Sequence, residues 1–187
     1  MRRSLTTLAA RGVAAAIVTG SLLAPRPAAA DLAVGATAPA FTTQAAHGGD
    51  VTTFDLATAL EKGPVVVYFY PKSFTSVCTA EAHAFSDHMD DYAKLGATVI
   101  GLSGDSIATQ KDFSTKECRA KFPVGADQGL KIAKSYDAKS NYFVVSFASR
   151  TSYVVAPDGK IAYVLSSGNP NAHVDGTLAA LRKLEAK

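Results

Sequence analysis

The sequence predicts an α/β domain in three layers, with a mixed central β-sheet flanked by helices. Two observations carry this prediction. Apolar runs that are typical of buried strands alternate with helix-like stretches along most of the chain, as in sheets with parallel strands. Near the end, two apolar runs flank the turn sequence PDG (157–159), and such a hairpin adds antiparallel strands.

The first half of the chain supplies the central strands. Short strands are expected around PAFTTQ (39–44) and VTTFDL (51–56). The run PVVVYFY (64–70) is apolar, β-branched and aromatic throughout, which indicates a central strand covered on both faces. A helix over 76–95 should follow, stopped by Gly96, and ATVIGLS (97–103) reads as a second buried strand.

The second half completes the pattern. Asp105 or Ser106 is expected to cap a helix that runs to about Ala120. The remaining elements are predicted as a short strand in FPVGAD (122–127), a short helix in QGLKIAKSY (128–136), the hairpin 151–165 and an amphipathic helix over 174–186. The turn-rich stretch SGNPNAH (167–173) reads as a connector.

The N-terminus has the three-part pattern of a secretory signal peptide. A basic start, MRRSLTTLAAR, precedes the apolar stretch GVAAAIVTGSLLA, and PRPAAA ends in small residues. We therefore predict a signal peptide over 1–30, cleaved after Ala30, and one domain over 31–187. An uncleaved anchor is the alternative, although the apolar stretch is short for a membrane span. The expected location is periplasmic or secreted.

Removal of this segment changes the charge of the protein. Arg2, Arg3, Arg11 and Arg26 are four of the 19 basic residues and no acid accompanies them, so 15 basic and 16 acidic residues remain. The 157 residues left from 187 are enough for a hydrophobic core. A nearly neutral chain with no basic stripe argues against a nucleic-acid partner.

The reactive candidate is one of only two cysteines. Cys78 follows the run 64–70 and opens the predicted helix, where unpaired backbone N–H groups and the positive end of the helix dipole favour an anion. Ala82, Phe85 and Tyr92 recur on its face at helical spacing, so this face should point into the core. A thiol in that recess should ionise more readily than a free cysteine and act as a nucleophile. The alternative is a single structural disulfide to Cys118.

Other chemistries are less well supported. The strand is not followed by Cys-x-x-Cys, which a thioredoxin-like oxidoreductase would need. The four histidines form no pair at helical spacing and the two cysteines are scattered, so we expect no metal.

Three segments resemble the peroxiredoxins. YFYPKSFTSVCTAE (68–81) is similar to their peroxidatic loop, with its Pro-x-x-x-Thr-x-x-Cys motif. GATVIGLSGDS (96–106) and RTSYVVAPDGKI (150–161) are similar to the next strand and the arginine-bearing hairpin. The match runs from about Gly35 to the C-terminus and is nearest to the Q-type, or bacterioferritin comigratory, subgroup. It implies a thioredoxin-like fold.

The resemblance assigns roles to these residues. Cys78 is implied to be the peroxidatic cysteine, with Thr75 and Pro71 as pocket partners and Arg150 stabilising the thiolate. The backbone N–H groups of Val77 and Cys78 would stabilise the peroxide oxygens. The implied activity is a thiol-dependent peroxidase that reduces hydrogen peroxide and organic hydroperoxides through a sulfenic acid, without metal or organic cofactor. A thioredoxin-like or other dithiol reductant and a monomeric state are expected.

The second cysteine departs from the commonest Q-type pattern. Many relatives carry a resolving cysteine five residues after the peroxidatic one, and His83 stands there. A second branch carries it on the next helix, so the resemblance implies that Cys118 resolves the sulfenic acid as an intramolecular disulfide. The intervening helix has few large apolar residues, chiefly Ile107 and Phe113, and should open locally at low cost. The alternative is an exported redox-sensing or structural module with a static Cys78–Cys118 disulfide.

Overall fold

A computed structural model of the chain describes residues 32–186, so the predicted signal peptide over 1–30 lies outside the described residues. In chain order the elements are β1 (Thr42–His47), β2 (Asp50–Asp55), α1 (Leu56–Leu60), β3 (Val65–Phe69), α2 (Ser76–Asp87), α3 (Met89–Lys94), β4 (Thr98–Ser103), α4 (Ile107–Lys116), β5 (Val124–Ala126), α5 (Lys131–Ser135), β6 (Lys139–Tyr142), β7 (Val145–Ala148), β8 (Thr151–Val155), β9 (Ile161–Ser166) and α6 (Pro170–Glu185).

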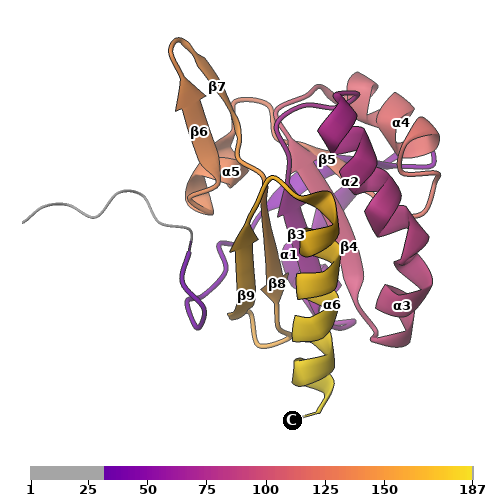
Figure 1. Cartoon of the computed structure of the whole chain (residues 1–187), viewed down its shortest axis with the longest axis vertical. Helices are drawn as coiled ribbons and strands as arrows, with labels where there is room; N and C mark the ends of the chain where they lie inside the picture. Colours follow the sequence, from indigo (N-terminus) through magenta and orange to yellow (C-terminus); the bar gives the residue numbers. More distant parts are fainter. Residues whose placement is uncertain (1–31, 187) are drawn as a thin grey trace, which may run out of the picture.

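Seven strands form one mixed sheet in the order β2-β1-β5-β4-β3-β8-β9 (Figure 1). The central strands β3, β4 and β5 pair in parallel, whereas β8 and β9 add antiparallel on one side and β1 and β2 on the other. The predicted mixed α/β sheet is therefore confirmed. β3 lies fully buried next to the middle of the sheet, and its carboxyl end leads directly to α2.

The sheet has a hydrophobic core on each face. Along β3, Val66 and Tyr68 belong to one half of the core and Val67 and Phe69 to the other, because successive strand side chains point to opposite faces. The half that contains Tyr68 also contains Cys78 and Cys118. Helices α2 and α6 pack side by side over this face (Figure 1). Both cysteines therefore lie in the same half of the core.

The predicted helix over 76–95 is interrupted. His88, with φ −108° and ψ 10°, separates α2 from α3. Asp90 and Asp91 stand in the first turn of α3, where carboxylates favour a new helix N-terminus. The prediction of one continuous helix was therefore wrong, because the helix breaks at His88. The two ends agree closely with the prediction.

The predicted helix to Ala120 ends earlier, at Lys116. It begins at the predicted cap, since the Ser106 hydroxyl accepts a hydrogen bond of 3.2 Å from the Thr109 N–H. Arg119 and Ala120 both have φ near 52°, in the left-handed region, which a right-handed helix excludes. Cys118 therefore lies in the turn after α4.

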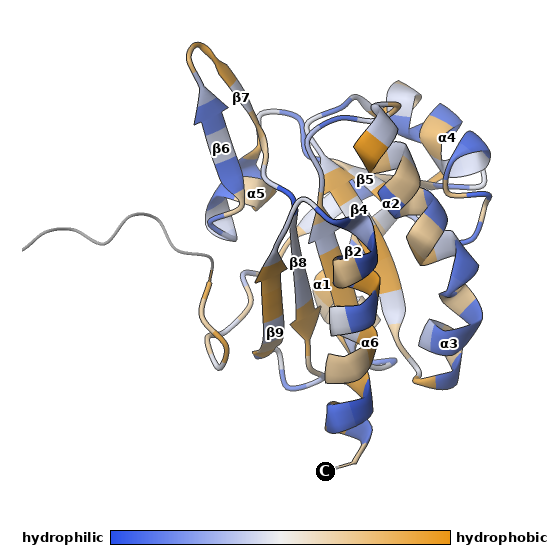
Figure 2. Ribbon diagram, in the orientation of Figure 1, coloured by the Kyte–Doolittle hydropathy of each residue, from blue (hydrophilic) through white to orange (hydrophobic). Residues whose placement is uncertain are grey.

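Two features near the C-terminus differ from the prediction. The hairpin β6–β7 was not predicted, and its turn places Phe143 at φ 51° without a glycine. It projects from the body with an apolar tip in which Phe143 and Val144 are 89% and 99% exposed (Figure 2). Helix α6 begins at Pro170, four residues before the predicted start, because Asn169 caps it with its side chain.

The part of the chain that the structure describes has no helix long and apolar enough to cross a bilayer.

Candidate active site

Cys78 lies in the first turn of α2, as predicted, and is only 2% exposed. Thr75 occupies the N-cap position, and the first helical hydrogen bond runs from the Thr79 N–H to the Thr75 carbonyl at 2.8 Å. The N–H groups of Val77 and Cys78 therefore have no acceptor within the helix and face its N-terminal end. This end of a helix favours a negative charge, such as a thiolate or a peroxide oxygen that gains charge.

Arg150 contacts the sulfur directly. It stands just before β8, and its Nη2 donates a hydrogen bond of 3.2 Å to Cys78 Sγ. Its side chain is 12% exposed. The resemblance implied that Arg150 stabilises the Cys78 thiolate, and this hydrogen bond brings the guanidinium to the sulfur.

The same guanidinium has a second partner that the sequence analysis missed. Arg150 Nη1 donates to Oε2 of Glu81, a carboxylate that is fully buried on α2. Burial raises the pKa of Glu81 to about 7, although the positive charge of Arg150 opposes this shift. Glu81 follows Cys78 by three residues and so shares its helix face, a spacing that could have identified it.

His173 extends this network from α6. Its side chain is fully buried, and Nε2 lies 3.8 Å from Glu81 Oε1. Ser152 Oγ lies 2.8 Å from Nδ1, and the Ser167 carbonyl lies 2.9 Å from Nε2. The stretch 167–173 is thus more than a connector, because it carries His173 into the buried site. Burial lowers the pKa of His173, and the Arg150 charge lowers it further, against the hydrogen bond to Ser167.

Neither of the two other predicted pocket residues makes a hydrogen bond to the sulfur. The Thr75 hydroxyl is exposed and donates to the Lys72 carbonyl at 2.9 Å, and it makes no capping hydrogen bond. Pro71 is half-buried between β3 and α2. Thr75 is the N-cap residue of α2 by position, but its hydroxyl turns to the preceding loop.

Cys118 is fully buried beyond α4, and burial raises the pKa of its thiol. Its carbonyl accepts a hydrogen bond of 2.9 Å from Ser86, and the preceding Glu117 contacts His83 at 2.9 Å. Ser86 is eight residues after Cys78 on α2, which corresponds to about 12 Å along a helix. Both cysteines are free thiols here. A disulfide needs Cα atoms within about 7 Å, so we expect a Cys78–Cys118 bond to need a local rearrangement.

A buried polar cluster anchors α4 more firmly than its sequence indicates. Gln110 Oε1 accepts a hydrogen bond of 2.7 Å from the Tyr70 hydroxyl, and Gln110 Nε2 donates to Ser103 and to the Gly125 carbonyl. Phe113 stacks on Tyr70 with ring centroids 5.5 Å apart. The helix before Cys118 is therefore attached through both polar and aromatic contacts.

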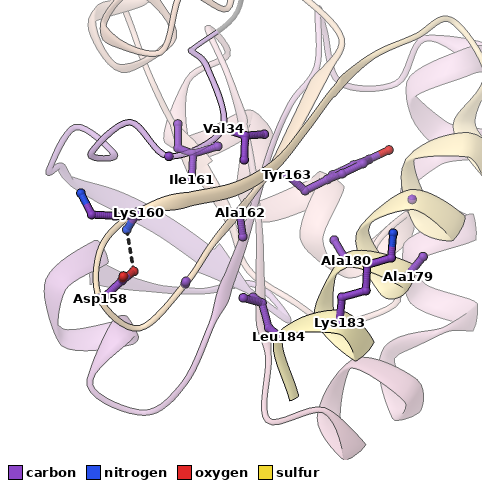
Figure 3. A pocket seen from close by; sticks show the side chains of 13 residues that line it. Val34, Asp158, Lys160, Ile161, Ala162, Tyr163, Ala179, Ala180, Lys183 and Leu184 are labelled. Carbon is purple, nitrogen blue, oxygen red and sulfur yellow. Dashed lines mark hydrogen bonds between the residues drawn. The ribbon is translucent and has the colours of Figure 1, made fainter. Parts of the chain in front are cut away.

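Two grooves lie away from Cys78. One of about 470 Å³ runs between β9 and α6, with Tyr163, Ala180 and Leu184 among its lining residues (Figure 3). A second, of about 520 Å³, is lined by residues of the β2, α1 and α3 region, including Phe54 and Met89. Neither contains a cysteine, so neither explains the reactive thiol. Within residues 32–186, no three His, Cys, Asp or Glu side chains are grouped as a metal ion would need.

Comparison with known proteins agrees with this geometry. The model of the AhpC/TSA family matches residues 34–164. Peroxiredoxin Q of Sedum lineare chloroplasts is 35% identical over 152 residues, which cover 81% of this chain and 78% of that protein. The chloroplastic peroxiredoxin Q of Oryza sativa subsp. japonica is 34% identical over 151 residues, covering 80% of this chain and 67% of that protein.

Solved structures show the same relationship. The crystal structure of peroxidoxin BcpB from Mycobacterium tuberculosis has a TM-score of 0.74 and 31% identity, covering 81% of this chain and 97% of that one. AhpC from the same organism has a TM-score of 0.72 and 25% identity, covering 84% of this chain and 95% of that one. The fold is therefore the thioredoxin-like fold of these enzymes, and the chain belongs to the AhpC/TSA family as a peroxiredoxin, a thiol peroxidase.

Proposed function

We propose that this peroxiredoxin reduces hydrogen peroxide and organic hydroperoxides through Cys78 and resolves the product with Cys118. The observation that carries the proposal is the hydrogen bond of 3.2 Å from Arg150 to Cys78 Sγ at the N-terminus of α2. The guanidinium contacts the sulfur in the first helical turn, where the N–H groups of Val77 and Cys78 have no acceptor within the helix. The same groups can stabilise the thiolate and the charge that develops on the peroxide oxygens.

The proposed first step is displacement at oxygen. The Cys78 thiolate attacks the terminal oxygen of a hydroperoxide, an S–O bond forms as the O–O bond breaks, and the alkoxide or hydroxide takes a proton and leaves as alcohol or water. Cys78 is oxidised to a sulfenic acid and the peroxide is reduced.

The proposed second step joins the two cysteines. The Cys118 sulfur displaces the hydroxyl of the sulfenic acid, which leaves as water, and an intramolecular disulfide forms. Because Ser86 fixes the Cys118 backbone well along α2, we expect the turn after α4 and the first turn of α2 to open. A thioredoxin-like or other dithiol then reduces the disulfide and is itself oxidised.

The test follows peroxide consumption with dithiothreitol as the reductant. Cys78→Ser should abolish turnover. Cys118→Ser should retain the first oxidation but lose the disulfide, which mass spectrometry after one equivalent of peroxide would reveal as a sulfenic acid on Cys78. Full turnover by both variants would refute the proposal. A bond between the two cysteines that is unaffected by dithiothreitol and peroxide would support a static structural disulfide instead.

We also propose that the protein is exported, with cleavage after Ala30, and that the remaining domain acts as a monomer. The support is the basic, apolar and small-residue pattern of residues 1–30. N-terminal sequencing of the protein from cell fractions, with size-exclusion chromatography, tests both points. An intact N-terminus in the cytoplasmic fraction would contradict export, and a dimer mass would contradict the monomer.

A further inference from the structure

One buried oxygen next to the active site has no hydrogen-bond partner among the described residues. It is Oε1 of Glu81, whose other oxygen accepts from Arg150. His173 Nε2 lies 3.8 Å from it, and both side chains are fully buried. An unpaired carboxylate oxygen in the interior is costly, so this arrangement needs a compensating charge or proton.

His173 can hold that compensating proton, because its hydrogen bonds fit both the neutral and the protonated form of the ring. A backbone carbonyl only accepts hydrogen bonds, so Nε2 carries a hydrogen toward Ser167. Nδ1 faces the hydroxyl of Ser152 at 2.8 Å, and a hydroxyl can either donate or accept. The neutral imidazole accepts from Ser152, whereas the imidazolium donates to it. His173 therefore changes charge without losing either hydrogen bond.

The charges around Glu81 indicate why such a proton matters. Arg150 before β8 and His173 on α6 contact Glu81, and Cys78 on its own helix shares Arg150 with it. The Tyr68 hydroxyl from β3 interacts with it electrostatically and is the other buried side-chain oxygen without a hydrogen-bond partner among the described residues. Burial raises the pKa of Tyr68 well above its ordinary value, so that hydroxyl stays neutral. When Cys78 is a thiolate and Glu81 is ionised, two negative charges share the single positive charge of Arg150. One proton on Glu81 or His173 restores neutrality.

We propose that His173 is a positioning residue for the peroxidatic centre: together with Glu81 it holds one proton, which cancels the Glu81 charge and leaves the Arg150 guanidinium to the Cys78 thiolate. This inference rests on the proposed function, in which Cys78 reacts as a thiolate. Loss of the shared proton at alkaline pH makes Glu81 compete for Arg150. The reactivity of Cys78 should therefore decline on the alkaline side.

The experiment compares His173→Gln, Glu81→Gln and the double variant, each carrying Cys118→Ser so that only Cys78 reacts. Glutamine at 173 can donate a hydrogen bond but cannot take up a proton, so the decline should move to lower pH. The rate of peroxide reduction at pH 7.5 should fall about tenfold, as for a change of one unit in proton affinity. Glutamine at 81 is permanently neutral and should remove the decline.

Two readouts are measured from pH 5 to 9: the rate of oxidation by hydrogen peroxide and the rate of Cys78 alkylation by iodoacetamide, followed by mass spectrometry. His83→Gln is the matched control, since His83 is a partly exposed histidine on α2 that pairs with Glu117. It should leave both profiles unchanged. If His173→Gln unfolds the protein, Ser152→Ala removes only the adaptable hydroxyl and should move the profile in the same direction.

The double variant separates positioning from packing. If His173 acts through Glu81, adding His173→Gln to Glu81→Gln should cause no further change in either profile. An equal effect of His173→Gln in both backgrounds, or a profile identical to that of the control, would overturn the proposal. Failure of peroxide to oxidise Cys78 in the unsubstituted protein would instead refute the proposed function, and the alkylation profile would still report on His173.

Discussion

Arg150 Nη2 donates a hydrogen bond of 3.2 Å to the sulfur of Cys78, although 72 residues separate them in the chain. The pairing of β3 with β8 brings them together, because α2 begins beyond the end of β3 and Arg150 stands at the adjoining end of β8. The antiparallel register Phe69↔Thr151 places the cation next to the helix N-terminus.

Replacing Arg150 by lysine should strongly reduce the reaction with peroxide. Lysine keeps the charge but lacks the planar fork that contacts Cys78 and Glu81 together. We expect the second-order rate constant for hydrogen peroxide to fall by about 100-fold, as for the loss of a donor that stabilises the transition state. Competition with a haem peroxidase measures this constant. Arg119→Lys alters an exposed arginine and should have no effect; an unchanged rate for Arg150→Lys would exclude its role.

Phe113→Leu should speed disulfide formation after oxidation. Phe113 is fully buried and stacks on Tyr70, and this contact holds α4 and the turn with Cys118 in place. Replacing the ring by the smaller leucine side chain should lower the free energy of unfolding by about 1–2 kcal/mol and make α4 open more often. Hydrogen exchange of α4 amides and rapid-quench analysis of the disulfide test this. Phe54→Leu, on the other half of the core, should destabilise without faster disulfide formation; equal acceleration by both variants would argue against local opening of α4.

Glu81→Gln should change the dependence of stability on pH. Burial raises the pKa of Glu81 from its ordinary value of 4.5 to about 7. A raised carboxyl pKa means that the folded state binds more protons than the unfolded state in this window. The protonated Glu81 carboxyl therefore contributes to the free energy of unfolding below pH 4.5. This contribution is lost as pH rises toward 7, by up to about 3 kcal/mol. Urea unfolding at several pH values should show a weaker decline for Glu81→Gln, and an identical decline would contradict the assignment.

Gly101→Ala should destabilise the central sheet. A Cβ at Gly101 would lie 2.6 Å from the ring of Tyr68, which cannot withdraw easily because it stacks on Phe85 at 4.4 Å. We expect a loss of about 1–3 kcal/mol in the free energy of unfolding. Gly168→Ala is the control, since its Cβ would meet nothing within 4 Å. Equal thermal unfolding of the two variants would show that the ring adjusts freely.

Local sequence patterns predicted the parts of the fold that depend on local chemistry. The run at 65–69 identified the central strand because it is apolar on both faces, and Ser106 was identifiable as a cap from its side chain. The hairpin β6–β7 was missed because its turn uses Phe143 in the left-handed region, where glycine or asparagine would have indicated a turn.

The sequence allowed a prediction of the site residues only through the resemblance that the Pro-x-x-x-Thr-x-x-Cys motif supports. The spacing from Pro71 to Cys78 carried the resemblance that singled out the thiol, and the same resemblance named Arg150. Glu81 and His173 escaped notice because a charged residue on an apolar face and a histidine after a turn both read as exposed. The spacing from Cys78 puts Glu81 on the buried face of the helix, whereas the burial of His173 follows from the packing of α6 against α2, which no local pattern encodes.

The interruption at His88 limits how far a disturbance at Cys78 can spread. Melting of a helix from its first turn proceeds residue by residue while the hydrogen-bonded ladder continues, and this ladder is broken between α2 and α3. Beyond the break, Tyr92 is bound to Thr177 of α6 at 2.7 Å. We therefore expect any unwinding that begins at Cys78 to stop at His88, so that α3 stays docked on α6 and keeps the far end of α2 in place.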